Sequence, residues 1–357
     1  MTKSIYNLNK RALLVILDGF GINSADLKNA VTAAKKPNLD YLFNSFPTTT
    51  IEAGVSGNSE VGHMNLGAGR PVRQDLVRIN EAISNNTLSK MPALKDLISF
   101  AKANSNRIHM MGLLSDGGVH SSIDHLEELA KILSNEGIEL YLHAFTDGRD
   151  TEPSCAKKYI DRIANSSHIK FASIQGRSIG MDRDRRWEKI QDAYETFLGK
   201  REKTNLSALE YLNSEYKAGR TDEFLKPVLL DDNGAIKEDD AIFFFNFRPD
   251  RAIQLSLAFN DKTFTEFDRP FLAAHFLCMV PYIPDEVKLP ILFDKEQLKG
   301  VMADHLESLN LKQLHIAETE KFAHVTYFFN GGNKKEHTGE QFVLIPSPKE
   351  VATYNQK

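Results

Sequence analysis

The feature that most constrains the fold of this chain is a recurring unit: a short apolar run, a turn, and a segment with helical periodicity. The apolar runs fall at residues 13–17, 107–114, 139–145, 171–175 and 241–247. Runs this short and this continuously apolar are typical of strands that are buried on both faces of a parallel sheet. Their alternation with helical segments predicts an α/β fold.

Other segments have the spacing of amphipathic helices. Residues 37–46 place several large apolar side chains on one face. A second helix follows Ser121, which together with Asp124 has the arrangement of a capping box. The remaining predicted elements are a helix at 187–197 and strands at 48–52 and 324–329.

Polar and charged residues follow several predicted strands at the point where each one ends. Arg149 and Asp150 come after the run at 139–145, Arg177 after the run at 171–175, and Arg248 after the run at 241–247. Open α/β sheets place their ligands at the carboxyl ends of the strands. We therefore expect these side chains to share one ligand site.

A serine and an aspartate raise the possibility of nucleophilic chemistry. Ser59 lies in the glycine-rich stretch 57–70, and Asp18 follows the apolar run at 13–17 directly. A carboxylate at a strand end and a serine on a glycine-rich turn suit a serine nucleophile that a metal ion activates. The simpler interpretation is that Asp18 stabilises a turn and Ser59 caps a helix, as most such residues do.

Composition narrows the class of protein. The net charge of the 357 residues is −4, which gives no reason to expect a nucleic-acid or membrane surface. The two cysteines, Cys155 and Cys278, argue against a disulfide framework and suit a reducing compartment. Neither a signal-peptide pattern nor an apolar stretch of membrane-spanning length occurs. We expect a cytoplasmic protein.

A series of motifs gives the chain a resemblance to a known family. The motifs are residues 14–21 (LVILDGFG), 57–70 (GNSEVGHMNLGAGR), 115–121 (SDGGVHS), 146–151 (TDGRDT), 181–187 (MDRDRRW), 246–252 (NFRPDRA) and 318–321 (ETEK). In this order they resemble the motifs of the cofactor-independent (2,3-bisphosphoglycerate-independent) phosphoglycerate mutases. The resemblance covers essentially the whole chain.

The resemblance implies an α/β architecture with two domains. An alkaline-phosphatase-like domain, incomplete in this sequence, would consist of residues 1–71 and 291–357. An inserted α/β transferase domain, which binds substrate, would consist of residues 72–290. The proline-rich segment at 281–290 and residues 71–74 are the predicted connections.

The resemblance also implies an activity and a set of site residues. The family interconverts 3-phosphoglycerate and 2-phosphoglycerate in glycolysis, as a monomeric isomerase with two divalent metal ions, typically Mn²⁺. Ser59 would be the nucleophile that forms a phosphoserine, and Asp18 and Ser59 would be metal ligands. The implied substrate-binding residues are His120, Arg149, Asp150, Arg177, Arg183, Arg248, Arg251 and Lys321. The only implied partner is the small-molecule substrate.

Simpler interpretations of these residues remain open on the sequence alone. Residues 182–186 have the composition of a solvated charge run, and we assign Arg185 and Arg186 a structural role. Arg248 and Asp250 suit an ordinary strand-end ion pair, and Lys321 suits a surface position. His63 and His125 match no family role.

Most of the family's metal ligands come from a later stretch with Asp-x-x-x-His, Asp-His-Gly-Asn and a further histidine. Residues 303–306 (ADHL) lack the glycine, and residue 333, four positions before His337, is an asparagine. We therefore expect an amino-terminal fragment of the enzyme that is itself inactive. Two alternatives are a metal-dependent phosphomonoesterase of the same superfamily and a non-catalytic fragment that binds phosphoglycerate.

Overall fold

The protein is represented by a computed structural model that describes residues 11–23, 29–51, 59–166, 168–272, 274–283, 287–295, 298–333 and 336–348. The chain forms two compact units. Unit 1 consists of residues 1–72 and 297–357, and unit 2 consists of residues 73–296. Leu292 and Phe293, shortly before the second boundary between the units, are buried in the same hydrophobic core as the strands of unit 2.

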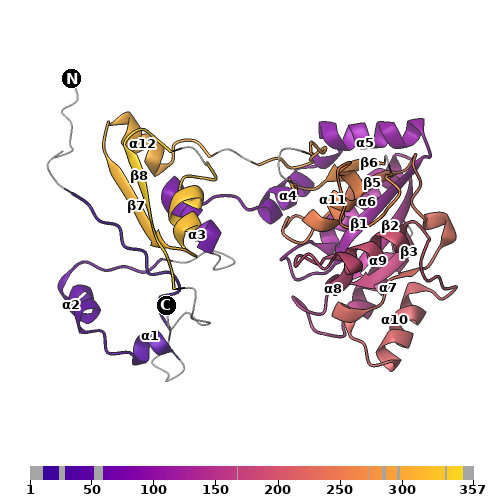
Figure 1. The fold of residues 1–357 in the computed structure, drawn as a ribbon, viewed down its shortest axis with the longest axis horizontal. Helices are drawn as coiled ribbons and strands as arrows, with labels where there is room; N and C mark the ends of the chain where they lie inside the picture. The colour runs from indigo at the N-terminus through magenta and orange to yellow at the C-terminus, as the bar shows by residue number, and fades with distance from the viewer. Residues whose placement is uncertain are drawn as a thin grey trace. The chain divides into compact units, whose positions relative to one another are not determined.

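Unit 2 is built on a six-stranded sheet with the order β4-β3-β2-β1-β5-β6 (Figure 1). All neighbouring strands are parallel except β4, which pairs antiparallel with β3. The strands are β1 Arg107–Leu114, β2 Glu139–Thr146, β3 Lys170–Gly176, β4 Val228–Leu229, β5 Ala241–Phe244 and β6 His275–Cys278. The predicted strands at 107–114, 139–145 and 171–175 are confirmed, and the one at 241–247 ends at Phe244.

Helices enclose this sheet. The α-helices of unit 2 are α4 Asp75–Ser84, α5 Pro92–Ala103, α6 Ile123–Asn135, α7 Ala156–Asn165, α8 Arg177–Gly180, α9 Trp187–Phe197, α10 Ala208–Lys217 and α11 Ile253–Asn260. Three 3₁₀ turns lie at Leu88–Lys90, Asp222–Phe224 and Asp232–Gly234. Every residue of β1 and β2 after the first is buried, so both faces of the central strands are covered.

The start of α6 differs from the predicted capping box. Ser122, not Ser121, is the N-cap residue, and its side chain makes no capping hydrogen bond. The Ser121 hydroxyl instead donates a hydrogen bond of 2.5 Å to the carbonyl oxygen of Leu113. Ser121 is fully buried, so its hydroxyl satisfies a strand-end carbonyl where water cannot. The helix predicted at 187–197 is confirmed as α9.

The topology of unit 2 fixes where a ligand can bind. The chain runs outward from β1 through β2 to β3, and on the other side from β5 to β6. The strand order therefore reverses between β1 and β5. Crevices at the carboxyl ends of strands at such a reversal are where doubly wound α/β folds hold ligands.

Unit 1 has less regular structure. Its elements are α1 Ala30–Ala33, α2 Pro37–Ser45, α3 Ser59–Ala68, α12 Met302–Ser308, a π-helix at His324–Phe328, and the parallel pair β7 Gln313–Glu318 and β8 Glu340–Ile345. The helix predicted at 37–46 is confirmed as α2. None of the helices in the described ranges combines the length and apolar character that a membrane crossing requires.

Three predicted strands of unit 1 are wrong. Residues 13–17 form no strand, and Leu13 remains 87% exposed. Residues 48–51 are also irregular, and Glu52 lies outside the described residues. The segment predicted as a strand at 324–329 is mostly π-helix. An apolar run becomes a strand only where a neighbouring strand accepts its backbone hydrogen bonds, and no described strand pairs with residues 13–17 or 48–51.

Candidate active site

Unit 1 brings together three of the predicted site residues. Ser59 is the first residue of α3, Asp18 lies in the turn after the apolar run, and Lys321 follows β7. The Ser59 hydroxyl donates a hydrogen bond of 2.6 Å to Oδ2 of Asp18. The Lys321 ammonium contacts the same carboxylate oxygen and lies 3.2 Å from Ser59 Oγ. The alternative of a serine that only caps a helix does not account for this convergence.

The electrostatics of this cluster favour an ionised carboxylate. Hydrogen bonds from Lys321, and then from Ser59, hold the pKa of Asp18 below its ordinary value. An ionised carboxylate and a hydroxyl are oxygen ligands of the kind that divalent cations prefer. The Lys321 ammonium already occupies the cationic position beside Asp18. The Asp18 carboxylate and the Ser59 hydroxyl have the chemistry of metal ligands and would supply two of them. A complete metal site requires further ligands.

The π-helix of unit 1 packs against the helix that carries Ser59. A β-carbon added at Gly67 of α3 would lie 1.7 Å from the carbonyl oxygen of Phe329, so the two backbones touch. His63 bonds the carbonyl oxygen of Ser59 through Nδ1 at 2.8 Å, and its ring contacts that of His324. Such π-turns occur frequently at functional sites. Nothing in the apolar pattern of 324–329 distinguished a π-helix from a strand.

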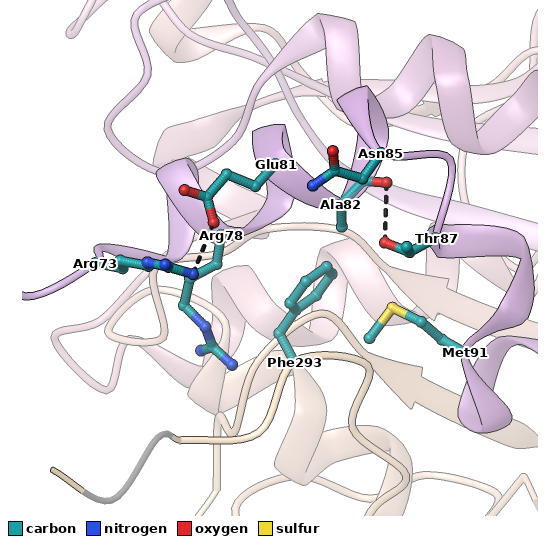
Figure 2. Close-up of a pocket in the computed structure, with 8 residues that line it drawn as sticks. All are labelled: Arg73, Arg78, Glu81, Ala82, Asn85, Thr87, Met91 and Phe293. Atoms are coloured by element: carbon teal, nitrogen blue, oxygen red, sulfur yellow. Dashed lines mark hydrogen bonds and ion pairs between the residues drawn. The ribbon is translucent and has the colours of Figure 1, made fainter.

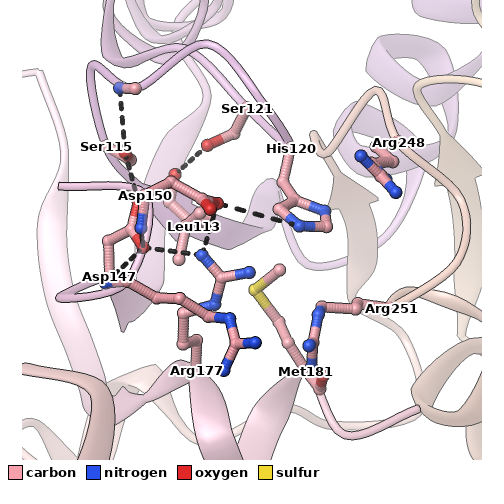
Figure 3. A network of polar contacts seen from close by, with 12 residues as sticks. Leu113, Ser115, His120, Ser121, Asp147, Asp150, Arg177, Met181, Arg248 and Arg251 are labelled. Carbon is pink, nitrogen blue, oxygen red and sulfur yellow. Dashed lines mark hydrogen bonds and ion pairs between the residues drawn. The ribbon is translucent and has the colours of Figure 1, made fainter. Parts of the chain in front are cut away.

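Unit 2 gathers the second group of predicted residues at the carboxyl ends of its strands (Figure 3). His120 follows β1, Asp150 follows β2, Arg177 follows β3, and Arg248 follows β5. The β1 and β5 residues flank the reversal of strand order. These side chains form a cluster of polar contacts, and its role as a ligand site stays a prediction.

Arg177 is the buried centre of that cluster. Its side chain is 2% exposed, and Nη1 lies 2.6 Å from Asp147 Oδ1 and 2.5 Å from Asp150 Oδ2. Burial alone would lower the pKa of Arg177, but the hydrogen bonds to Asp150 and Asp147 outweigh burial and raise it. Burial would likewise raise the pKa of Asp147, yet hydrogen bonds from Ser115, the Asp150 backbone and Arg177 lower it. The group is a fixed ion-pair network.

Two further arginines pair with Asp250, and a third contacts the loop that carries Arg183. Arg183 Nη1 is 2.7 Å from Asp250 Oδ2, and Arg248 Nε is 3.1 Å from Asp250 Oδ1. Arg251 donates a hydrogen bond of 3.0 Å to the carbonyl oxygen of Met181. The pKa of Arg251 is lowered by burial, and then by the positive charges of Arg177 and Arg183. Guanidinium groups held this close to one another suit an anionic ligand that carries phosphate or carboxylate oxygens.

His120 lies between two carboxylates. Nε2 is 3.8 Å from Asp150 and Nδ1 is 3.5 Å from Asp250, and the side chain is almost fully buried. Burial, and then the charge of Arg177, lowers the pKa of His120 to about 4. The imidazole is therefore neutral near pH 7 and keeps one ring nitrogen as a donor for a ligand oxygen.

One predicted residue points elsewhere. The Arg149 guanidinium is about half exposed and lies 3.3 Å from Glu223. Arg186 pairs with Asp182 and Asp184, in keeping with the structural role predicted for it. The Nε2–H group of His125 donates a hydrogen bond of 2.7 Å to Asn80 Oδ1, and His125 takes no part in the cluster.

Sequence reasoning missed the carboxylates that organise the site. Asp147 accepts hydrogen bonds from Ser115 and Arg177, and Asp250 joins Arg183 to Arg248. Asp147 directly follows β2, so the rule that singled out Asp150 also applied to it. The sequence predicts Asp250 only as an ion-pair partner of Arg248. That ion pair is present, and Asp250 also pairs with Arg183.

The two segments that partly match the family's metal motifs, residues 303–306 and the segment around His337, contact each other. His337 Nε2 lies 2.9 Å from Asp304 Oδ1, and its Nδ1 lies 3.3 Å from Glu340 Oε2. The contact is internal to unit 1. Among the described residues, no group of three or more histidine, cysteine, aspartate or glutamate side chains is arranged to hold a metal ion.

A cavity of about 320 Å³ in unit 2 lies apart from these residues (Figure 2). Its lining comes from α4 and the segments on either side of it, from Met91 just before α5 and from Phe293, and none of the predicted site residues contributes to it. Arg73 and Glu81 close one side through an ion pair of 3.0 Å. This cavity is therefore not the ligand site that the sequence predicts.

Comparison with known proteins identifies the family. A sequence model of the BPG-independent phosphoglycerate mutase N-terminus matches residues 79–284. The 2,3-bisphosphoglycerate-independent phosphoglycerate mutases of Methanococcoides burtonii and Clostridium tetani are 45% and 44% identical to this chain. Both alignments cover 98% of this chain and 72% of the relative. The chain belongs to the BPG-independent phosphoglycerate mutase family.

A solved relative supports the same assignment. The phosphoglycerate mutase of Leishmania mexicana, in a crystal structure at low cobalt concentration, superposes with a TM-score of 0.70 at 28% identity. The match covers 96% of this chain and 68% of that one. The expected fold class of this family member, an inserted α/β transferase domain together with a phosphatase-like fold, is thereby confirmed. The family is one of isomerases.

Proposed function

We propose that this chain is built to interconvert 3-phosphoglycerate and 2-phosphoglycerate through a phosphoserine at Ser59. The observation that carries the proposal is the convergence on Ser59: its hydroxyl donates to Asp18 at 2.6 Å, and the Lys321 ammonium lies 3.2 Å from the same oxygen. A serine needs such partners, because an isolated hydroxyl is a weak nucleophile.

We propose that the site uses two divalent metal ions and that both are Mn²⁺. Asp18 and Ser59 would hold one of them, and the ion would supply Lewis-acid stabilisation and favour the ionised serine. Asp18 accepts from the neutral hydroxyl and orients its oxygen. Lys321 places a compact positive charge where phosphate oxygens arrive. The crystal structure of the Leishmania mexicana enzyme at low cobalt concentration supports a divalent metal in this family.

The unit 2 cluster would hold the glycerate part of the substrate. The Ser59 Oγ–phosphorus bond forms as the substrate oxygen–phosphorus bond breaks, and the reverse step returns the phosphoryl group to the other glycerate hydroxyl. His120, Asp150, Arg177 and Arg183 would retain glycerate between the two steps. Arg149, which pairs with Glu223 in this structure, would exchange that partner for the glycerate. Arg248, Arg251 and Lys321 would balance the charge of the moving phosphoryl group.

We further propose that residues 1–71 and 291–357 form the phosphatase-like domain and residues 72–290 the transferase domain. The division of the chain into two units supports this assignment. Glycolytic chemistry and two free cysteines support a cytoplasmic location. From the family resemblance we propose a monomer whose partner is its small-molecule substrate.

We infer that a polypeptide of these 357 residues has little mutase activity by itself. Asp18 and Ser59 supply two ligands, whereas two divalent cations together need about eight to twelve. The alternative functions of phosphate release and of simple binding therefore belong in the test.

The test is to incubate the purified 357-residue chain with 3-phosphoglycerate and Mn²⁺. Formation of 2-phosphoglycerate at about 10 per second would contradict the inferred inactivity, release of inorganic phosphate would indicate a phosphomonoesterase, and saturable binding without turnover is the expected result. In the longer relative from Methanococcoides burtonii, mass spectrometry of the acid-quenched enzyme should find phosphate on the serine aligned with Ser59. Replacing that serine with alanine should reduce activity at least about a thousandfold. An alanine at the position aligned with the exposed Ser84 is the control.

A further inference from the structure

The loop that carries Arg183 is held by a side chain outside the motifs used so far. Residues 181–186 connect α8 to α9, and Gln254 lies in the first turn of α11. Both polar atoms of the Gln254 carboxamide bond to this loop. Nε2 donates to the carbonyl oxygen of Asp182 and, at 3.0 Å, to Asp182 Oδ2, while Oε1 accepts from the backbone amide of Arg185 at 2.6 Å.

The loop needs such a constraint because its backbone is strained. Arg185 has a φ of +58°, a left-handed conformation that non-glycine residues rarely adopt. Asp182 is fully buried, and its carboxylate accepts hydrogen bonds from the backbone amides of Asp184 and Arg186 at 2.9 and 3.0 Å. Gln254 is itself 5% exposed, so an unpaired carboxamide there would be costly. The Asp182 carboxylate and the Gln254 carboxamide together stabilise one conformation of the 181–186 loop.

That conformation determines where the Arg183 guanidinium lies. Arg183 pairs with Asp250 at 2.7 Å, and Asp250 and Arg248 precede α11 by only a few residues. Gln254 therefore connects the two segments that contribute Arg183, Arg248 and Arg251. Arg251 adds a second link through the Met181 carbonyl oxygen.

We propose that Gln254 is a positioning residue for anion binding, which fixes the 181–186 loop so that Arg183 meets the substrate with Arg248. The proposal rests on the proposed function, since it takes phosphoglycerate as the ligand. Gln254 is not itself a predicted substrate-binding residue, and it acts through Arg183.

The experiment measures 3-phosphoglycerate binding to the 357-residue chain by calorimetry. Gln254→Met removes both hydrogen-bonding groups at nearly constant volume, and Gln254→Asn shortens the amide so that it cannot reach both partners. Each variant should raise the Kd about tenfold, as expected when a charge-assisted contact loses its alignment. In an Arg183→Ala background, the same substitutions should change the Kd less than about twofold, because the residue they act through is gone. Asn260→Ala, at the far end of α11, is the matched control.

Limited trypsin digestion tests the loop without any ligand. Cleavage after Arg183, Arg185 and Arg186 should accelerate about tenfold in both Gln254 variants and not in Asn260→Ala, because a released loop samples cleavable conformations more often. Equal weakening of binding in both backgrounds, unchanged binding, or loss of cooperative folding would each overturn the positioning role. A parent chain that does not bind 3-phosphoglycerate, with trypsin still separating the variants, would refute the proposed function and leave only the loop constraint.

Discussion

The two units use the same strand pairing with opposite outcomes for burial. In unit 2, Leu113 of β1 is 1% exposed, whereas in unit 1, Leu314 of β7 is 58% exposed, although both strands pair in parallel with a neighbour. Parallel sheets are stable when both faces are covered. Helices cover both faces in unit 2, and no described segment covers the face of β7 and β8 that carries Leu314 and Ile316. The comparison shows that backbone pairing forms a sheet but does not by itself bury it.

Loss of the Arg177 guanidinium should break unit 2 most severely. Arg177→Met leaves the buried Asp147 and the partly buried Asp150 without their arginine partner, which we expect to lower the free energy of unfolding of unit 2 by about 3–5 kcal/mol and to abolish phosphoglycerate binding. Trp187 is the single tryptophan of the chain and lies in α9, so its fluorescence reports unit 2 alone. Arg73→Met, which removes only an exposed ion pair with Glu81, should shift that transition by less than about 1 kcal/mol. Equal effects of the two substitutions would contradict the buried network.

A pair of leucine truncations compares the units directly. Leu126→Ala in α6 opens a cavity in the unit 2 core and should cost about 2–5 kcal/mol, whereas Leu314→Ala should change stability by less than about 0.5 kcal/mol. Tryptophan fluorescence measures the first, and hydrogen exchange of the β7 peptide measures the second. A large, concentration-dependent effect of Leu314→Ala would mean that this face is covered in solution by another copy of the chain.

The same comparison explains what the sequence could predict. The strands of unit 2 are continuous apolar runs because both of their faces are buried, and pattern alone therefore located β1, β2 and β3 closely. The run at 13–17 has the same local pattern, yet it pairs with no described strand. Local pattern reports what a segment can bury and contains no information about whether a partner is present.

The site was predictable to the extent that it follows strand ends. Arg177 and Asp150 meet at 2.5 Å because the carboxyl ends of β2 and β3 are adjacent. The chemistry of Asp18 and Ser59 suggested that they act together, and the family resemblance added Lys321. No spacing rule joins these three residues, which are far apart in the chain. The roles of Asp250 and Gln254 depend on side-chain geometry within loops, which no periodicity records.

The smallest predicted effect is a difference in sign between the units as the pH falls. In unit 2, burial lowers the pKa of His125 to about 4. Between that pH and the ordinary value of 6.5, the unfolded chain binds a proton that the folded chain does not. His125 therefore contributes full stability above pH 6.5, and by pH 5.5 acidification should remove about 1.4 kcal/mol through this group.

In unit 1, His337 should act in the opposite direction. Burial would lower its pKa, but hydrogen bonds to Asp304 and Glu340 outweigh burial and raise the pKa above 6.5. The folded state then binds the extra proton, so His337 stabilises unit 1 fully below pH 6.5 and loses that contribution as the pH rises through the folded pKa. The free energy of unfolding of unit 2 is measured by Trp187 fluorescence at pH 7.5 and 5.5. His125→Gln should reduce the stability that unit 2 loses between these two pH values. The stability of unit 1 is measured by hydrogen exchange of α12 at the same two pH values. His337→Gln should remove the stability that unit 1 gains at the lower pH. If His125→Gln left the acid loss of unit 2 intact, the buried neutral imidazole would not be its source.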